Sequence, residues 1–167
     1  MKKLILMLML LAPVATFAQQ KFGHVNAQAV MESLPEFIKA RGEVESQAKI
    51  YDNQLKEMQT EIQKKAEEYD KTQATMNETK RKETENNLQN LYQKFQQAQQ
   101  DNAQAIQKLQ NEKLQPIVTK LQNAIKNVGK AGNYVYIMDL SSGIPYISET
   151  LSKDVTAEVK AEMNKLK

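Results

Sequence analysis

The apolar residues between Glu43 and Val128 recur at alternating steps of three and four, and this spacing constrains the fold more than any other feature of the chain. Such steps place side chains on one stripe of a helix, which is the pattern of a coiled coil. One seam begins at Val44 and a second at Leu88, with a polar break between them. Two helices of this kind in sequence predict one long antiparallel hairpin. The chief apolar members of the two seams are Val44, Tyr51, Leu55, Met58, Ile62, Tyr69, Leu88, Leu91, Phe95 and Leu109.

The first predicted helix starts at Pro35, whose missing N–H would have no partner in the first turn of a helix in any case. The predicted helix continues to about Ala74 without an internal proline, and its roughly forty residues at a rise of roughly 1.5 Å each give an arm of about 60 Å. Neither Gly nor Pro marks the turn, which we place at residues 74–78. There Asn77 can cap the second helix, and Thr75 with Glu78 offers a rival capping box.

Folding the chain back near Asn77 brings the two seams into register. Met58 then faces Phe95, and Val44 faces Leu109. This match supports a hairpin more strongly than either seam alone. Toward the turn the seam carries polar residues, so less apolar area is buried there and this end should open most easily.

Residues 1–18 have the layout of an export signal. Lys2 and Lys3 precede an apolar run at residues 4–11, and small residues follow around Ala18, where a signal peptidase would cut. The run is too short to span a bilayer as a permanent helix, which makes a membrane anchor the weaker alternative. We therefore expect a signal peptide at residues 1–18 and one exported domain at residues 19–167.

Cysteine content and charge exclude several kinds of protein. The sequence contains no Cys, so an exported domain must gain its stability from packing or assembly. Loss of Lys2 and Lys3 with the signal peptide lowers the net charge from +3 to +1, because the remaining chain has 21 basic and 20 acidic side chains. A chain this close to neutral is not expected to be a dedicated nucleic-acid binder.

The flanks of the hairpin are expected to form one small head, from residues 21–42 and 114–167, with the arm at residues 43–113. A unit this small without disulfides buries little surface, and its strands leave open edges. Oligomerisation through the head would satisfy both needs. The expected fold class is therefore α+β and mainly helical, with a long antiparallel coiled-coil hairpin projecting from a β-strand head that oligomerises. The residues expected at the oligomer contact are Phe22, Val25, Val135, Ile137 and Ile147.

The elements expected in the head are strands and short helices. Residues 21–26 alternate like a strand, and residues 134–140 are rich in residues that favour strands. Residues 144–148 are expected to pair with the second run as a hairpin. A last amphipathic helix should follow, capped by Ser152 or Asp154.

No group of residues predicts a catalytic, metal or cofactor site. His24 is the only histidine and has no second His or Cys as a partner ligand, so no metal site is expected. A triad of His24, Asp139 and Ser141 can be imagined, but strand packing explains His24 better and a turn explains Asp139. The glycines at residues 129–132 lack the pattern of a phosphate-binding loop. We expect neither an enzyme nor a bound cofactor.

Two polar stretches of the arm each allow two interpretations. Lys80, Arg81 and Lys82 form a compact basic cluster near the predicted turn, and acidic residues interleave with it, which favours a solvated, salt-bridged face. The alternative is attraction to an acidic client or weak contact with a membrane surface. Residues 93–110 contain eight glutamines, but their apolar residues keep helical spacing, which favours a helix over a prion-like segment.

The order of these elements resembles the Skp (OmpH-like) periplasmic chaperones along essentially the whole exported chain. The matching stretches are KFGHVN at 21–26, LKEMQTEIQKK at 55–65, IKNVG at 125–129, YVYIMD at 134–139 and SKDVTAEV at 152–159. The resemblance implies a periplasmic homotrimer whose strands form a shared body and whose three arms enclose a cavity. Members hold unfolded outer-membrane β-barrel proteins there without ATP. Members are often strongly basic and this chain is nearly neutral, so no lipid-binding residue is carried over.

The sequence therefore leaves two alternative functions. The first is a periplasmic holdase chaperone, whose partners are unfolded outer-membrane proteins and other copies of itself, and which binds through many weak contacts. The second is a structural coiled-coil spacer or adaptor of the cell envelope, which would bind one folded partner.

Overall fold

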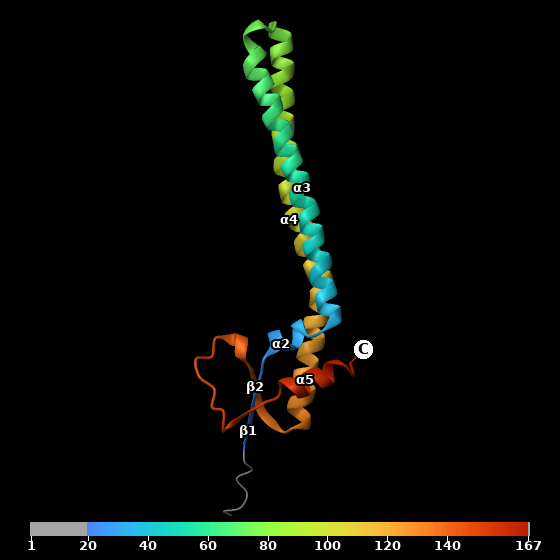
Figure 1. Ribbon diagram of the computed structural model, residues 1–167, viewed down its shortest axis with the longest axis vertical. Coiled ribbons are helices and arrows are strands. Elements are labelled where there is room, and N and C mark those ends of the chain that lie inside the picture. Colours follow the sequence, from blue (N-terminus) through green and yellow to red (C-terminus); the bar gives the residue numbers. More distant parts are fainter. Residues whose placement is uncertain (1–19, 167) are drawn as a thin grey trace, which may run out of the picture. The chain divides into compact units, whose positions relative to one another are not determined.

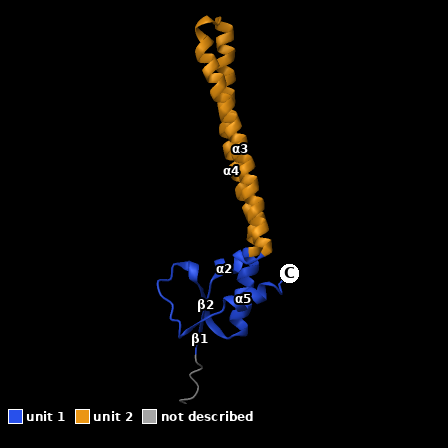
Figure 2. Ribbon diagram, viewed as in Figure 1, with its two compact units in different colours: residues 1–34, 118–167 blue, residues 35–117 orange. Residues whose placement is uncertain are grey.

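The computed structural model describes residues 20–166, so the predicted signal peptide lies outside the described residues. The chain forms two compact units, shown in Figure 1 and coloured separately in Figure 2. From here on, the head means residues 20–34 and 118–166, and the arm means residues 35–117. Within residues 20–166, no helix combines the length and the apolar character that a membrane span requires.

The arm is a hairpin of two long helices, which run side by side in Figure 2. α3 spans Pro35–Thr72, and one 3-10 turn, η2, follows at Gln73–Thr75. α4 spans Glu78–Ala131, runs unbroken through Pro116 and ends in the head. Met76 and Asn77 separate η2 from α4, within the expected window for the turn.

Two contacts far apart along the arm define its antiparallel register. Near the turn, the Tyr69 hydroxyl donates a hydrogen bond to the Glu85 carboxylate, and these residues lie eight positions before and eight positions after Asn77. Far from the turn, the Lys113 Nζ lies 2.6 Å from the Glu43 Oε2. These two residues are 36 positions after and 34 positions before Asn77, so the register changes by two residues along the arm. The chain thus folds back about Asn77.

Each arm helix carries one line of side chains that are less exposed than their neighbours. Ile62 is only 6 % exposed and Val44 is similarly buried. Lys65, which the sequence spacing places on the seam, is instead exposed, and the half-buried Ala66 takes its place. A methyl group can be buried without a partner, whereas burial of an unpaired ammonium group is costly. The other seam residues expected from the sequence are half-buried: Tyr51, Leu55, Met58, Tyr69, Leu88, Leu91, Phe95 and Leu109.

The head contains a three-stranded parallel sheet in the order β2-β1-β3. The strands are β1 at Lys21–Val25, β2 at Tyr134–Asp139 and β3 at Ser152–Asp154. The expected hairpin is therefore wrong, because residues 144–148 form no strand and β3 pairs with β1. Pro145 has no N–H to donate to the hydrogen bonds between paired strands. The central strand β1 pairs along one edge with β2 and along the other with β3.

The two faces of this sheet differ in exposure. Val25 is fully buried on one face, where Gly23 also lies. The opposite face carries Phe22, which is paired in register with Tyr136, and their rings stack with centroids 4.8 Å apart. Met138 lies on this face as well, and both Tyr136 and Met138 are exposed. The sheet thus has one core face and one more open face, on which Phe22, Tyr136 and Met138 lie beside the polar residues His24, Ser152 and Asp154.

Two short helices complete the head. α2 spans Ala27–Glu32 and is capped by Asn26, whose Oδ1 accepts the Ala29 N–H at 2.9 Å. α5 spans Thr156–Met163 and packs against α2 and β1. Neither cap expected for α5 is its N-cap residue, because Ser152 and Asp154 lie in β3 and the N-cap is Val155, although Asp154 accepts the Thr156 N–H at 2.8 Å. The largest fully buried side chains of the head are Val25, Val30, Val155, Val159 and Met163.

Candidate functional site

The head residues with catalytic potential make structural hydrogen bonds. The His24 Nδ1 lies 2.9 Å from the Ser152 Oγ, a contact that joins β1 to β3. Asp139 caps the 3-10 turn η3 at Leu140–Ser142, because it accepts the Ser141 N–H at 3.1 Å and the Ser141 hydroxyl at 2.6 Å. His24 and Ser141 thus have different partners, and the imagined triad does not form. In the described part of the chain, no group of three His, Cys, Asp or Glu side chains could hold a metal ion.

The protonation of Asp139 fits its role in this turn. Partial burial raises the pKa of Asp139, but hydrogen bonds from Ser141 and from the Ala27 N–H outweigh this effect and hold the pKa below its usual value. The group is therefore a carboxylate at neutral pH and acts only as a hydrogen-bond acceptor. It connects the end of β2 to the start of α2.

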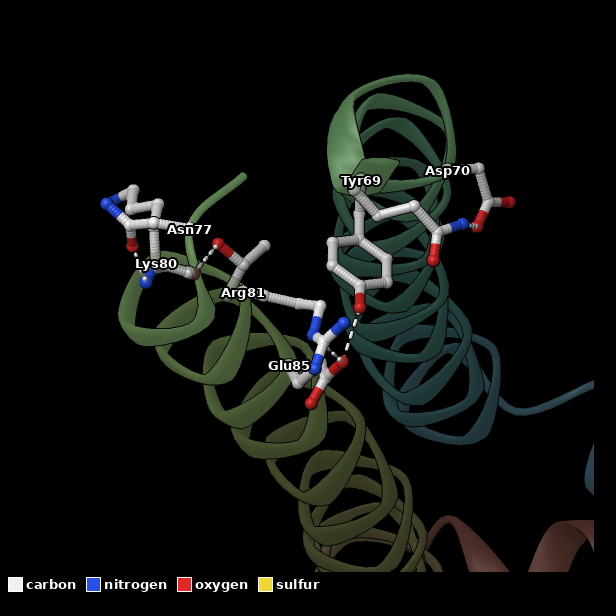
Figure 3. Close-up of polar contacts among 8 residues, drawn as sticks. Tyr69, Asp70, Asn77, Lys80, Arg81 and Glu85 are labelled. Carbon is white, nitrogen blue, oxygen red and sulfur yellow. Dashed lines mark hydrogen bonds and ion pairs between the residues drawn. The ribbon is translucent and has the colours of Figure 1, made fainter. Parts of the chain in front are cut away.

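The turn of the arm is organised by Asn77 (Figure 3). The Asn77 Oδ1 accepts the Lys80 N–H at 2.8 Å, which caps the first turn of α4. The rival capping box does not form, because the Thr75 hydroxyl donates to the Thr72 carbonyl oxygen at 2.9 Å. The cap that the sequence favours is thus the one used.

Next to this turn, Glu85 connects the two helices of the arm. Figure 3 shows Tyr69 pointing from α3 toward Glu85 on α4, with Arg81 beside the carboxylate. The Arg81 Nε lies 3.9 Å from the Glu85 Oε1. The hydrogen bond to Glu85 raises the pKa of Tyr69, since a phenolate next to a carboxylate is unfavourable. A polar bridge therefore links the helices where the seam carries fewer apolar residues.

The basic cluster of Lys80, Arg81 and Lys82 is exposed and lies next to acidic partners. The Lys80 Nζ is 3.0 Å from the Glu83 Oε2, and Arg81 pairs with Glu85 as described. These carboxylates lower the positive field that the cluster presents to its surroundings. The geometry favours the solvated, salt-bridged interpretation over attraction to an anionic surface.

The outward surfaces of the two arm helices differ in chemistry. Residues 47–68 of α3 include nine charged side chains, whereas residues 86–107 of α4, which face them across the hairpin, include two. Twelve of the 22 residues in this α4 stretch are Asn or Gln. Residues 93–110 are helical throughout, as their apolar spacing predicts. The arm therefore offers two long exposed surfaces, one charged and one rich in carboxamides.

Known proteins share this sequence pattern and architecture. The sequence matches the family described as Outer membrane protein (OmpH-like) over residues 21–163. The chain belongs to the OmpH-like family. Its fold is similar to the crystal structure of a candidate outer membrane chaperone (OmpH-like) from Caulobacter crescentus CB15, with a TM-score of 0.68, 14 % identity and coverage of 89 % of this chain and 86 % of that chain. A search of the curated proteins finds no match.

Family membership confirms the resemblance noted in the sequence, and long helices with a small three-stranded sheet agree with it. In this OmpH-like chain, the head residues expected at an oligomer contact lie in different environments. Val25 is fully buried within its own chain and offers no surface to a second copy, whereas Val135 is 57 % exposed. Phe22, Ile137 and Ile147 are half-buried.

Sequence reasoning missed several exposed apolar residues of the head. Tyr136 and Met138 lie on the open face of the sheet, Leu140 follows β2, and Tyr146 and Leu151 lie in the connection to β3. The predicted hairpin was the cause of this error. It assigned residues 144–148 to a strand paired with residues 134–140, so these side chains were not expected to be exposed. The parallel pairing of β1 with both neighbours was needed to find them.

Proposed function

We propose that this OmpH-like chain is an ATP-independent holdase chaperone of the periplasm, exported by a signal peptide that is cleaved near Ala18. It binds unfolded outer-membrane β-barrel proteins and prevents their aggregation before membrane insertion. Membership of the OmpH-like family supports this function, and so does the similar fold of the candidate outer membrane chaperone. The observation that carries the proposal is the arm, in which the 38-residue helix α3 and residues 78–117 of α4 use one seam for each other and leave most of their remaining surface exposed.

A long exposed surface suits a client that has no fixed shape. Each contact with an unfolded chain is weak, and simultaneous contacts multiply the affinity. Such binding needs no nucleotide. The client is released when it folds, because its folded form no longer makes these contacts with the arm. Tight binding at a single pocket is not expected.

We propose further that the active form is a homotrimer joined through its heads, with the three arms around a shared cavity. The family resemblance implies the number of subunits. The uncovered apolar side chains of the head support an assembly, because clusters of this kind mark interaction surfaces. Val135, Tyr146 and Leu151 are 57 %, 78 % and 73 % exposed. In the described sheet, β2 and β3 also each keep one edge without a partner strand.

An aggregation assay tests the holdase function. A β-barrel outer-membrane protein is diluted from urea into buffer with the purified exported chain and without ATP, and turbidity is followed. The proposal predicts that a stoichiometric amount of the chain keeps the client soluble. Precipitation at the rate seen without the chain would refute it.

A structural spacer or adaptor is the second candidate, and the continuous seam of the arm favours it. The two helices of the arm contact each other from the Glu43–Lys113 ion pair to the Tyr69–Glu85 hydrogen bond. A hairpin paired over this length could hold two folded partners apart. A spacer predicts capture of one folded envelope protein in stoichiometric amount and no protection of unfolded clients. A pull-down beside the aggregation assay distinguishes the two functions.

A further inference from the structure

Residues 86–107 of α4 have an unusual chemistry for an exposed helix. Twelve of the 22 residues carry a carboxamide, and Lys94 and Asp101 are the two that carry charge. The stretch of α3 that faces them, residues 47–68, has the same length and nine charged residues. The two helices share one seam, so the contrast belongs to their outward surfaces.

The carboxamides follow the geometry of the hairpin. With the α4 seam at Leu88, Leu91 and Phe95, the positions farthest from the seam recur every seven residues. Asn86, Gln93, Gln100 and Gln107 occupy that line, and all are exposed. Neighbouring exposed carboxamides widen the line into a strip about 30 Å long. We call it the amide strip, and its members are Asn86, Gln89, Asn90, Gln93, Gln96, Gln97, Gln100, Gln104 and Gln107.

The polar groups of the amide strip are largely available. Among the described residues, Gln97 is the strip member with an intramolecular partner, because its Nε2 donates to the Asp101 Oδ1 at 2.9 Å. An open hollow is lined by Asn90, Gln93 and Gln97 together with Leu91 and neighbouring residues. Tyr92 is also exposed, and its position on the helix is next to the strip members Gln89 and Gln96, three residues before it and four residues after it. Outward polar groups of α3 more often pair within that helix, as in the Lys65–Glu61 and Gln63–Glu67 contacts.

A carboxamide offers the same donor and acceptor as a peptide group. A row of carboxamides can therefore hydrogen-bond to an extended main chain whatever side chains it carries. Because the strip is nearly neutral, it neither repels a charged segment nor requires a charge to lose its water. Tyr92 adds apolar contact for the side chains that lie between these bonds.

We propose that the amide strip is the surface of the arm that contacts clients, and that it recognises the main chain of an extended, unfolded polypeptide. This inference rests on the proposed holdase function. An anionic lipid or a nucleic acid would need a positive strip, whereas the members of the amide strip are uncharged and residues 86–107 as a whole contain one Lys and one Asp. A second arm would need a continuous row of exposed apolar side chains. Leu88, Leu91 and Phe95 already lie in the seam with α3, and Tyr92 alone does not make such a row.

Alanine substitution on each helix tests the proposal in the full exported chain. The strip variant combines Gln93→Ala, Gln96→Ala, Gln100→Ala and Gln104→Ala. The matched control combines Asn53→Ala, Gln59→Ala, Thr60→Ala and Gln63→Ala, which removes four uncharged polar side chains from the exposed surface of α3. Alanine favours the helix at all eight positions, so both variants keep the arm.

The readout is the Kd for a fluorescently labelled β-barrel protein diluted from urea, measured at low and at high NaCl concentration. We expect the strip variant to bind about tenfold more weakly, from the loss of several hydrogen bonds. The control should stay within about twofold, and the wild-type Kd should change less than about threefold with salt, since the strip carries almost no net charge.

Three outcomes would overturn the inference. The strip variant could bind as well as the wild type, the α3 control could lose more affinity, or binding could fall steeply with salt. A second variant, Gln93→Glu with Gln100→Glu and Gln107→Glu, keeps side-chain size and removes the amide donors, and wild-type affinity in this variant would also refute the inference. If the wild type binds no unfolded client, the holdase proposal fails, whereas a binding wild type with an unaffected strip variant refutes the amide strip alone.

Discussion

Gly132 determines how the chain leaves α4 and enters β2. The Gly132 N–H donates to the Val128 carbonyl oxygen at 2.9 Å, and Asn133 then adopts a φ of 53°. A Cβ added to Gly132 would lie 2.3 Å from the Cε2 of Tyr134, far inside van der Waals contact. The absence of a side chain here lets the Tyr134 ring lie against the end of the helix.

Two glycine substitutions should therefore have opposite effects. Gly132→Ala should destabilise the head by about 1–3 kcal/mol, because the Tyr134 ring must move to make room. Gly42→Ala should stabilise the arm by about 0.5–1 kcal/mol, because it lies within α3 and an added Cβ would meet nothing within 4 Å. Urea unfolding followed by circular dichroism measures both. A shift of the same sign in the two variants would contradict the prediction.

The Tyr69–Glu85 hydrogen bond makes the arm sensitive to alkaline pH. The pKa of Tyr69 is raised above its ordinary value of 10.0 by this bond, so the stabilising effect is complete below pH 10.0 and is lost as pH rises through the folded pKa. Phenolate formation can be followed by ultraviolet absorbance as the pH is raised, in the wild type and in Tyr69→Phe. The difference between the two curves should show one titrating group with a midpoint above pH 10.0. Glu85→Gln should lower this midpoint. A difference curve centred at or below 10.0 would refute the bond.

At the scale of elements, local patterns predicted the arm and failed for the sheet. Periodicity and capping are properties of neighbouring residues, so the two helices and the Asn77 cap could be read from them. The pairing of β1 with β3 joins Phe22 to Ser152, which is a tertiary choice that no local pattern contains. Residues 144–148 contain Ile and Tyr, which favour strands, but the second edge of β1 pairs with residues farther along the chain.

The amide strip shows a limit of a different kind. The seven-residue spacing of Asn86, Gln93, Gln100 and Gln107 is visible in the sequence. Its meaning depends on which face of α4 is buried and on the charges of the helix opposite, so it emerges only after the register of the hairpin is known. Exposure alone would not have selected it, since most outward residues of the arm are exposed.

The seam can be tested with two isoleucines of one helix. Ile62→Ala should destabilise the arm by about 2–4 kcal/mol, because Ile62 is 6 % exposed and the substitution leaves a cavity between the helices. Ile50→Ala should cost less than about 1 kcal/mol, because Ile50 is 49 % exposed. Thermal unfolding followed by helical circular dichroism compares them. Equal losses in the two variants would mean that Ile62 is not on the interface between the helices.

At the scale of the whole molecule, the two units expose different kinds of surface. The head exposes apolar side chains such as Val135, Tyr146 and Leu151, whereas the outward surface of the arm is mostly polar. Apolar surfaces gain most from lasting burial against a partner, and polar ones remain stable in water. A chain built in this way can assemble through its heads while its arms stay open to weakly bound clients.

Charged residues at the exposed apolar positions of the head should therefore dissociate the proposed trimer. The variant Val135→Glu with Leu151→Glu changes two side chains that are mostly exposed, so each chain should still fold, while burial of unpaired carboxylates between subunits would be strongly unfavourable. Light scattering should give the molar mass of three subunits for the wild type and of one for the variant. Ile50→Glu on the arm is the control and should leave the mass unchanged. A wild-type monomer would remove the shared cavity from the proposed mechanism, and a variant that remains trimeric would place the contact elsewhere on the head.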